Sequence, residues 1–473
     1  MFPSHPFIDG KPCQSREERR LELTEPATEE ALTEIFAAGP GEVDDAVTGA
    51  QRAFENGWRD LPPGKRAEIL FAVATKLRER AGEIAGLDSR NVGKPIADAR
   101  DEAALGARVF EYYAGAISKF CGETIPVALG GFDFTLRQPM GVVAAIVPWN
   151  FPFPIACWKV APALAAGNCV VLKPASLSPL SAMLLGELAH EAGLPAGVLQ
   201  VIPGGGAAIG DALVTHPLVR KISFTGSTEI GAHIMQLAAR GIKRVSLELG
   251  GKSPNIVFAD ADLEKAAGTS PMSVFANAGQ DCCARSRVFV ERSVFDRFVE
   301  IFVETTRALK VGDPARSETQ IGPLVSRRQR ETVESYLTTA RQREIIGGDR
   351  IAGRGFYLRP AVVLGCEPGD EIWREEIFGP VACIRPFDDE GAMLREVNDS
   401  PYGLSGSIWT NDLRRALRVA RRVESGVLSV NSHSSVHVEA PFGGFKQSGL
   451  GRDLGMSALD GYSELKNIFI SDE

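Results

Sequence analysis

The chain has 473 residues, of which 44% are hydrophobic and 24% charged, and its formal net charge is −8. This length and composition are typical of a globular protein with two or three domains. The basic residues are scattered rather than gathered in a tail or stripe, which argues against nucleic acid as a partner and favours small molecules.

The N-terminal third predicts helices before any strand. The start at Met1 lacks the basic residues and the apolar run of a signal peptide, which argues against secretion. Apolar residues recur at helical spacing over 43–54 and again over 69–77. We therefore expect helices to come first in this chain.

The most apolar stretch, residues 141–172, has the length of a membrane span. Several prolines in it would break a single helix, and Lys159 would place a charge in the lipid. A buried strand followed by a short helix fits this stretch better, so no membrane partner is expected.

Short β-branched runs then alternate with helical segments. The expected strands of a first block are 142–147, 169–173, 198–202 and 221–225; those of a second are 255–258, 287–290, 381–387 and 426–431, around a helix at 413–425. Strands separated by helices imply right-handed crossovers and parallel sheets. Segments 122–138 and 464–470 fit neither block and read as strands that could pair with a neighbouring subunit.

The eight cysteines are spread through the chain without the density of a disulfide scaffold, which favours the reducing cytoplasm. The cysteines and the six histidines show no paired spacing of the kind that holds a metal. We expect no metal site.

A dinucleotide site is indicated after the strand at 221–225, where Gly226 and Ser227 lead into a helix. A glycine turn between a strand and a helix N-terminus can hold a pyrophosphate, because free N–H groups and the helix dipole face the anion. On its own the turn is equally compatible with a plain strand-to-helix connection. Lys173, which leaves a strand just before Pro174, points toward the edge where nucleotides bind in such sheets.

Five short motifs together change the interpretation. They are PWNFP at 148–152, LELGGK at 247–252, GQDCCA at 279–284, EEIFGP at 375–380 and PFGGFKQSG at 441–449. With these motifs the sequence resembles the aldehyde dehydrogenase superfamily, and the resemblance covers essentially the whole chain in the family's order. It implies an α/β fold with a Rossmann-like dinucleotide-binding domain (1–118 and 140–247), a second α/β catalytic domain (248–445) and a small β oligomerisation extension (119–139 and 446–473), assembled as a homodimer or homotetramer.

The same resemblance implies oxidation of an aldehyde to its acid through a cysteine-bound thioester. Cys282 matches the nucleophile, because a thiolate attacks a carbonyl near neutral pH and leaves a thioester that water can open. Asn150 matches the amide that stabilises the oxyanion together with the Cys282 N–H. Glu248 matches the general base that activates the water. Lys159 and Asp453 resemble a proton-relay pair, although many relatives carry glutamate in place of Asp453.

The expected cofactor is NAD, with NADP left open. The residues that the resemblance assigns to it are Val147, Trp149, Lys173, Ser176, Gly206, Gly226, Ser227, Ile230, Leu249, Glu376 and Phe378. Relatives that prefer NAD often have glutamate where this chain has Ser176, and that carboxylate would repel a 2′-phosphate. Ser176 carries no such charge, so the chain is expected to discriminate less strongly between NAD and NADP.

The substrate is expected to lie among Phe151, Trp158 and Phe442, which match aromatic tunnel positions of the family. Asp281 and Glu439 could favour a cationic substrate such as an ω-aminoaldehyde or a betaine aldehyde. Leu105, however, stands where that branch would place a further acidic group, so a general aliphatic or aromatic aldehyde is preferred.

Two other functions stay open at this point. One is an acylating enzyme that passes the acyl group to coenzyme A or phosphate; the Glu248 context argues instead for hydrolysis. The other is a non-catalytic binding or structural relative, against which the presence of Cys282, Glu248 and Asn150 speaks.

Overall fold

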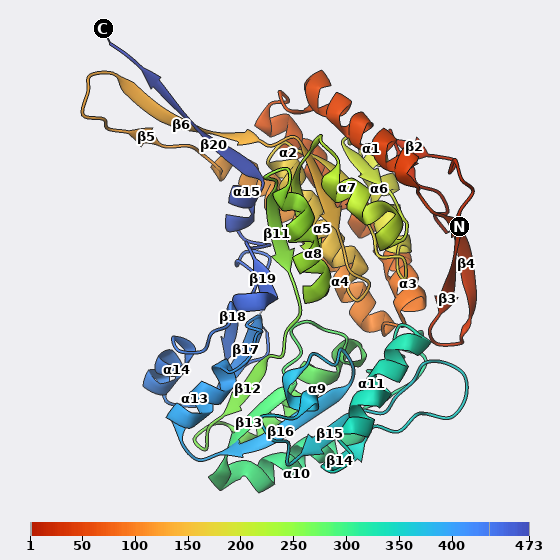
Figure 1. Ribbon diagram of the computed structural model, residues 1–473, viewed down its shortest axis with the longest axis vertical. Helices are drawn as coiled ribbons and strands as arrows, with labels where there is room; N and C mark the ends of the chain where they lie inside the picture. The colour runs from red at the N-terminus through yellow and green to blue at the C-terminus, as the bar shows by residue number, and fades with distance from the viewer. Residues whose placement is uncertain (1, 435, 473) are drawn as a thin grey trace.

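The computed structural model describes residues 2–434 and 436–472, which form two α/β units and a projecting β arm (Figure 1). Met1 and Glu473, the outer limits of the expected domains, lie outside the described residues.

The first unit contains a sheet of eight strands in the order β19-β11-β10-β7-β8-β9-β1-β2. Its parallel centre confirms the four strands expected in the first block, with small differences at their ends. The four expected strands are β7 (Val142–Ile146), β8 (Cys169–Lys173), β9 (Leu199–Val201) and β10 (Val219–Thr225). The other strands of the sheet are β11 (Arg244–Glu248) and, at the edges, β1 (Phe7–Ile8), β2 (Lys11–Pro12) and β19 (Gly449–Leu450).

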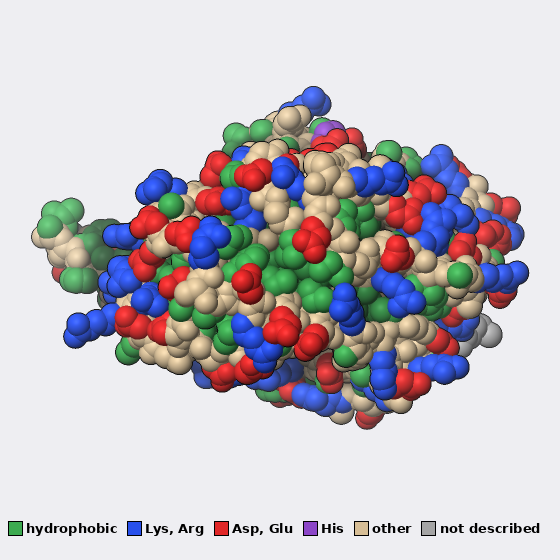
Figure 2. Space-filling view, turned by 90° about the horizontal axis from the view of Figure 1, so that it is seen from below, with side chains coloured by type: hydrophobic (Ala, Val, Ile, Leu, Met, Phe, Trp, Pro, Cys, Tyr) green, Lys and Arg blue, Asp and Glu red, His purple; other side chains and the backbone are tan. Residues whose placement is uncertain are grey.

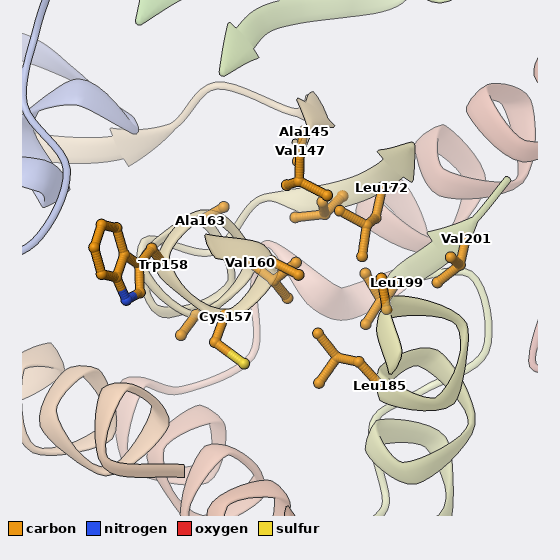
Figure 3. Packing of buried hydrophobic residues seen from close by; sticks show 14 of the residues in the cluster. Ala145, Val147, Cys157, Trp158, Val160, Ala163, Leu172, Leu185, Leu199 and Val201 are labelled. Atoms are coloured by element: carbon orange, nitrogen blue, oxygen red, sulfur yellow. The ribbon is translucent and has the colours of Figure 1, made fainter. Parts of the chain in front are cut away.

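Helices surround this sheet. They are α1 (Pro40–Ala53), α2 (Pro63–Glu79), α3 (Ala81–Val92), α4 (Ile96–Ala116), α5 (Pro152–Ala165), α6 (Leu180–Glu191), α7 (Asp211–Thr215) and α8 (Thr228–Ala239). All residues of α5 are buried, and the apolar stretch is the strand and short helix expected from its prolines. In Figure 3, Val160 of α5 points toward Leu172 and Leu199, whereas Trp158 projects on the opposite side of the helix. Among the described helices, none has both the length and the apolar character needed to cross a bilayer.

The expectation that helices come first is wrong. Strands β1 and β2 and the hairpin of β3 (Arg20–Glu25) and β4 (Glu30–Phe36) precede α1. In β3 only Leu23 is buried, so this hairpin presents little of the alternating apolar pattern that identifies a strand in a sequence.

The second unit has seven strands in the order β14-β15-β16-β13-β12-β17-β18. They are β12 (Pro254–Val257), β13 (Arg287–Glu291), β14 (Glu344–Gly347), β15 (Ala361–Leu364), β16 (Val381–Phe387), β17 (Ser405–Trp409) and β18 (Val427–Val430). The helices are α9 (Leu263–Phe275), α10 (Phe295–Ala308), α11 (Arg327–Thr339), α12 (Glu371–Arg374), α13 (Glu390–Asn398) and α14 (Leu413–Ala420). The four strands expected here are confirmed, while the helix expected at 413–425 ends earlier, at Ala420.

Short helix α15 (Ser457–Gly461) leads into the arm, which consists of β5 (Thr124–Ile125), β6 (Phe132–Pro139) and β20 (Ser463–Ile470). Strand β20 runs antiparallel to β6, from the pair Ser463 and Pro139 to the pair Ile470 and Phe132. Figure 1 shows the arm extending away from both units. On the face in Figure 2, acidic and basic side chains are intermixed around a central group of hydrophobic side chains.

Candidate functional site

The loop that carries Cys282 begins with an unusual backbone. Asn277, Ala278 and Gly279 follow α9 with φ angles of 51°, 55° and 71°, three consecutive residues in the left-handed region. A Cβ at Gly279 would lie 2.1 Å from the carbonyl oxygen of Gly379, so a side chain there would require the backbone to shift. The loop is thereby held against the segment that contains Phe378.

Gln280 anchors the same loop from within. It is completely buried; its Nε2 donates to the Asn277 carbonyl and its Oε1 accepts from the Val325 N–H, both at 2.9 Å. On the other side of the nucleophile position, the Cys283 N–H donates to Asp281 Oδ1 at 2.8 Å. Hydrogen bonds therefore hold the loop on both sides of Cys282.

Cys282 borders two cavities. One, of about 640 Å³, lies along the carboxyl edge of the first sheet. The other, of about 290 Å³, is lined by α5 and by residues of the second unit. A hydrogen bond with Cys283, together with burial, raises the pKa of Cys282 well above its usual value. The residue therefore rests as a thiol and needs a base before it can attack.

Asn150 follows β7 and is buried beside the nucleophile loop. Its Nδ2 donates to the Gln280 carbonyl at 2.9 Å. Its own carbonyl accepts from Lys94 Nζ and Asn277 Nδ2, both at 3.0 Å. These bonds direct an amide donor toward the loop of Cys282, and both residues line the larger cavity.

Glu248 ends β11 and lines the smaller cavity together with Cys282. Its Oε2 has no hydrogen-bond partner in the part of the chain that the structure describes. A Cβ at residue 443 would lie 2.6 Å from Glu248 Oε1, so Gly443 leaves the carboxyl its space. Burial raises the pKa of Glu248 well above its usual range, as expected for a group that exchanges protons near neutral pH.

Lys159 and Asp453 form a fully buried ion pair of 2.9 Å. Lys159 also donates to Ser223 Oγ at 3.1 Å. After burial, the Asp453 charge is the next cause that raises the pKa of Glu248, and the Lys159 charge opposes it. The pair thus acts on the candidate base through its charges.

Most of the expected cofactor residues line the larger cavity. These are Val147, Trp149, Lys173, Gly206, Gly226, Ser227, Ile230, Leu249, Glu376 and Phe378. Ser176 does not: it borders a separate cavity, and its Oγ donates to the Gly204 carbonyl at 3.1 Å. Ser176 therefore does not line the larger cavity, whereas its neighbour Ala175 does.

The N-terminus of α8 faces this cavity. Ser227 caps the helix by accepting from the Ile230 N–H at 3.4 Å, directly after β10 and Gly226. Lys173, at the end of β8, is buried and donates to the Pro174 carbonyl at 3.1 Å. Burial lowers the pKa of Lys173 to about 8.

Glu376 and Phe378 close the cavity from the second unit. Glu376 Oε1 accepts from the Gly251 N–H at 3.0 Å, and burial raises the pKa of Glu376 to about 7. Phe378 has a φ of 56° and meets the Trp149 ring edge-on, with 5.1 Å between centroids. This corner combines a carboxyl acceptor with an aromatic wall.

The smaller cavity contains the expected aromatic residues. Phe151, Trp158 and Phe442 line it with Asp281, and the rings of Trp158 and Phe442 meet edge-on at 5.4 Å. Glu439, expected near its mouth, is not among the lining residues. It is half exposed and pairs with Arg108 at 2.5 Å. Of the two carboxylates expected to attract a cation, only Asp281 borders this space.

Several residues of the site are not apparent from the sequence. Lys94 lies 3.9 Å from the centroid of Phe151 and pairs with Glu102 at 2.5 Å, and Glu102 lines the smaller cavity. Arg285 and His433 line it as well. Arg285 could have been found from its place three residues after Cys282, whereas no motif surrounds Lys94 or His433. Gln329, which lines the larger cavity, carries no such signal either.

The ligand atoms of Asp281, Cys282 and Cys283 lie within 4.8 Å of one another, close enough to hold a metal ion. This cluster comes from consecutive residues and not from the paired spacing considered in the sequence.

Comparison with known proteins adds independent findings. Residues 13–468 match the family described as the Aldehyde dehydrogenase family. The chain is 41% identical over 482 residues to 4-trimethylaminobutyraldehyde dehydrogenase of Homo sapiens, covering 98% of this chain and 97% of that protein. It is 42% identical over 472 residues to betaine aldehyde dehydrogenase 1 of Rhizobium meliloti, covering 98% and 96%. The NAD+ complex of an aldehyde dehydrogenase from Bacillus cereus matches with a TM-score of 0.98 at 38% identity, covering 99% of this chain and 97% of that one.

Proposed function

The chain belongs to the aldehyde dehydrogenase family, and from that premise we propose how its own residues oxidise an aldehyde to the carboxylic acid. The observation that carries the proposal is that Cys282 borders both cavities, one shared with Asn150 and the other with Glu248. A nucleophile in this position can meet an aldehyde from one side and a dinucleotide from the other.

The larger cavity suits NAD. Its volume of about 640 Å³ and the helix N-terminus at Ser227 fit a ligand that carries a pyrophosphate. We propose that Lys173 and Glu376 hold ribose hydroxyls and that Trp149 and Phe378 flank the nicotinamide. NAD, when bound, accepts the hydride that leaves the substrate carbon. We propose NAD as the working cofactor, because the Bacillus cereus relative was solved with NAD+; NADP is a weaker alternative that Ser176 does not oppose.

The first chemical step belongs to Cys282 and Asn150. The Cys282 thiol gives up its proton to solvent water, and the sulfur forms a bond to the aldehyde carbon. The carbonyl oxygen becomes an oxyanion, which the Asn150 side-chain amide and the Cys282 N–H stabilise. Loss of hydride from the same carbon restores the C=O bond and leaves a thioester on Cys282.

The second step belongs to Glu248. Its partly desolvated carboxylate takes a proton from a water molecule, and the resulting hydroxide attacks the thioester carbon. The C–S bond breaks, the carboxylic acid departs and the Cys282 thiolate is regenerated. Lys159 and Asp453 sit behind the base and pass its proton onward. The presence of Glu248 disfavours transfer of the acyl group to coenzyme A.

The substrate chain lies in the smaller cavity among Phe151, Trp158 and Phe442. We propose a general aliphatic or aromatic aldehyde in preference to an ω-aminoaldehyde, because Glu439 lies outside this cavity. The human and Rhizobium meliloti relatives are named for cationic aldehydes, and that class is the alternative.

The same proposal extends to the whole molecule. We assign residues 1–118 and 140–247 to dinucleotide binding, 248–445 to catalysis, and 119–139 and 446–473 to oligomerisation through the arm. All eight cysteines are free, which fits an enzyme of the reducing cytoplasm.

The direct test is to follow reduced nicotinamide while the purified chain is mixed with an aldehyde panel, using NAD or NADP and no coenzyme A. We expect turnover with NAD, a smaller kcat/KM with NADP, and release of the acid. Cys282→Ala should lose turnover by about a thousandfold or more and still bind NAD. Turnover that depends on coenzyme A, or a Cys282→Ala variant as active as the wild type, would overturn the proposal.

A further inference from the structure

Three consecutive side chains of the nucleophile loop converge on one point. A carboxylate oxygen of Asp281 and the sulfur atoms of Cys282 and Cys283 lie within 4.8 Å of one another. The Ala284 N–H donates to the Asp281 carbonyl at 3.0 Å and closes a turn over these residues. The Cys283 N–H donates to Asp281 Oδ1 at 2.8 Å and holds the carboxylate on the same turn. The fold therefore presents two sulfur donors and one oxygen donor together.

The cluster faces a space that an ion can enter. All three side chains line the smaller cavity, and those of Asp281 and Cys282 are only partly buried. Glu248 lines the same cavity, is 4% exposed, and has an Oε2 without a hydrogen-bond partner among the described residues. A buried acceptor without a partner is commonly satisfied by water or an ion. The cavity thus offers an unpartnered carboxyl oxygen beside the three donors.

The donor set favours a thiophilic divalent cation. Two thiolates and a carboxylate supply three ligands of a tetrahedral zinc site, and the open side of the cavity leaves the fourth position to water. Magnesium and calcium prefer oxygen ligands and gain little from sulfur. Arg285 lines the same cavity and opposes any cation by its charge, but metal–sulfur bonds do not depend on charge alone.

We propose that Asp281, Cys282 and Cys283 form an inhibitory site for Zn²⁺ and other thiophilic divalent cations. On binding, the two thiols give up their protons to solvent and each sulfur forms a bond to the metal, with no change of oxidation state. The Cys282 electron pair that attacks an aldehyde is then committed to the metal. The inhibition rests on the proposed role of Cys282, whereas the metal binding does not.

Metal binding is measured without turnover. In equilibrium dialysis the wild type should take up a zinc equivalent that Cys283→Ser lacks, and Co²⁺ as the probe should give a thiolate-to-cobalt charge-transfer band. Zn²⁺ should slow alkylation of Cys282 by iodoacetamide about tenfold or more, as read by peptide mass spectrometry. Cys283→Ser should lose the band and this protection. Cys121→Ser removes an exposed cysteine outside the cluster and should behave as the wild type.

Inhibition is measured with pentanal and NAD, each variant being compared with its own rate without metal. The Zn²⁺ concentration that halves the rate should rise about tenfold or more in Cys283→Ser and by a smaller factor in Asp281→Asn, since each loses one ligand. A chelator should restore the rate of the wild type. Mg²⁺ over the same range should not inhibit.

The outcomes separate the two proposals. No turnover with NAD, combined with protection of Cys282 by Zn²⁺, would count against the proposed function alone. Zinc uptake and protection that Cys283→Ser and Asp281→Asn leave unchanged, or inhibition by Mg²⁺ as strong as that by Zn²⁺, would overturn the metal site.

Discussion

At the scale of single residues, Glu376 is a buried carboxyl group on the wall of the larger cavity. Burial raises its pKa to about 7 from an ordinary value of 4.5, and the bond from the Gly251 N–H only partly opposes this. A Cβ on Gly250 would lie 2.2 Å from Glu376 Oε2, so the carboxyl has little room to move toward solvent. The folded chain thus binds this proton more tightly than the unfolded chain does.

The raised pKa of Glu376 makes its contribution to the unfolding free energy depend on pH. The contribution of Glu376 to stability is fully present below pH 4.5 and is lost as pH rises toward 7. Across that window the wild type should lose on the order of 3 kcal/mol of unfolding free energy relative to Glu376→Gln. Chemical denaturation of both proteins at several pH values measures this difference. A difference that stays flat across the window would contradict the assignment of a raised pKa.

Residues within motifs could be predicted, and residues outside them could not. Cys282, Asn150 and Glu248 lie in short sequence motifs whose residue types indicate their chemical roles, and the structure places them around neighbouring cavities. Ser176 and Glu439 were assigned from the resemblance to the family, and neither lines the cavity in which it was expected. Side-chain direction depends on long-range packing that a sequence does not display.

At the scale of elements, the left-handed backbone run before Cys282 should not tolerate a larger side chain at Gly279 but should tolerate a substitution at the neighbouring Ala278. Gly279→Ala places a Cβ 2.1 Å from the Gly379 oxygen, so the loop must move. We expect a loss of at least about 2 kcal/mol in unfolding free energy and roughly a hundredfold fall in kcat/KM, because the nucleophile is displaced.

Ala278→Gly is the matched control. Ala278 has a φ of 55°, a conformation that glycine adopts without strain, so its stability should stay within about 1 kcal/mol of the wild type. Equal tolerance of both substitutions, measured by thermal unfolding and steady-state rates, would show that the backbone here does not position Cys282.

Buried parallel strands were predictable because β-branched runs mark them, as in β8 and β16. Strand β11, which carries Glu248, was not predicted. Its first residues, Arg244 and Val245, are exposed or half-buried, so the apolar run is too short to stand out. The N-terminal hairpin of β3 and β4 was missed for a similar reason.

At the scale of the whole molecule, the arm exposes apolar side chains that a single chain does not cover. Leu465, Phe469 and Ile470 of β20 are 58%, 44% and 53% exposed, and Phe132 and Leu136 of β6 are 52% and 39% exposed. Apolar strands of this kind are typical of subunit contacts. Their place beyond both α/β units fits the oligomerisation role proposed for the arm (Figure 1).

Leu465→Glu should weaken that assembly. A charge on the exposed apolar face would have to be desolvated in the interface, so sedimentation velocity should show a smaller species than the wild type. Lys466→Glu adds a negative charge on the opposite face of the strand, which carries Ile470 and, on β6, Leu136 and Phe132, and it therefore tests that face separately. An unchanged sedimentation coefficient for Leu465→Glu would exclude this face as the interface.

The alternation of strands and helices was enough to predict two α/β units, yet not how they meet. Glu248 reaches the cavity because β11 pairs with Thr225 of β10 and with Gly449 of β19, two segments far apart in the chain. Cys282 comes from the second unit and Asn150 from the first. Their convergence depends on packing between units, which only the resemblance to a family could anticipate.

The most direct measurement is intact and peptide mass spectrometry of Glu248→Gln after mixing with NAD and an aldehyde. Without its base the chain should release about one reduced nicotinamide per site and retain the acyl group as a thioester on Cys282. An acyl group on another cysteine, or continuous turnover with no trapped adduct, would contradict the placement of Cys282, Glu248 and Asn150 around a single carbonyl carbon.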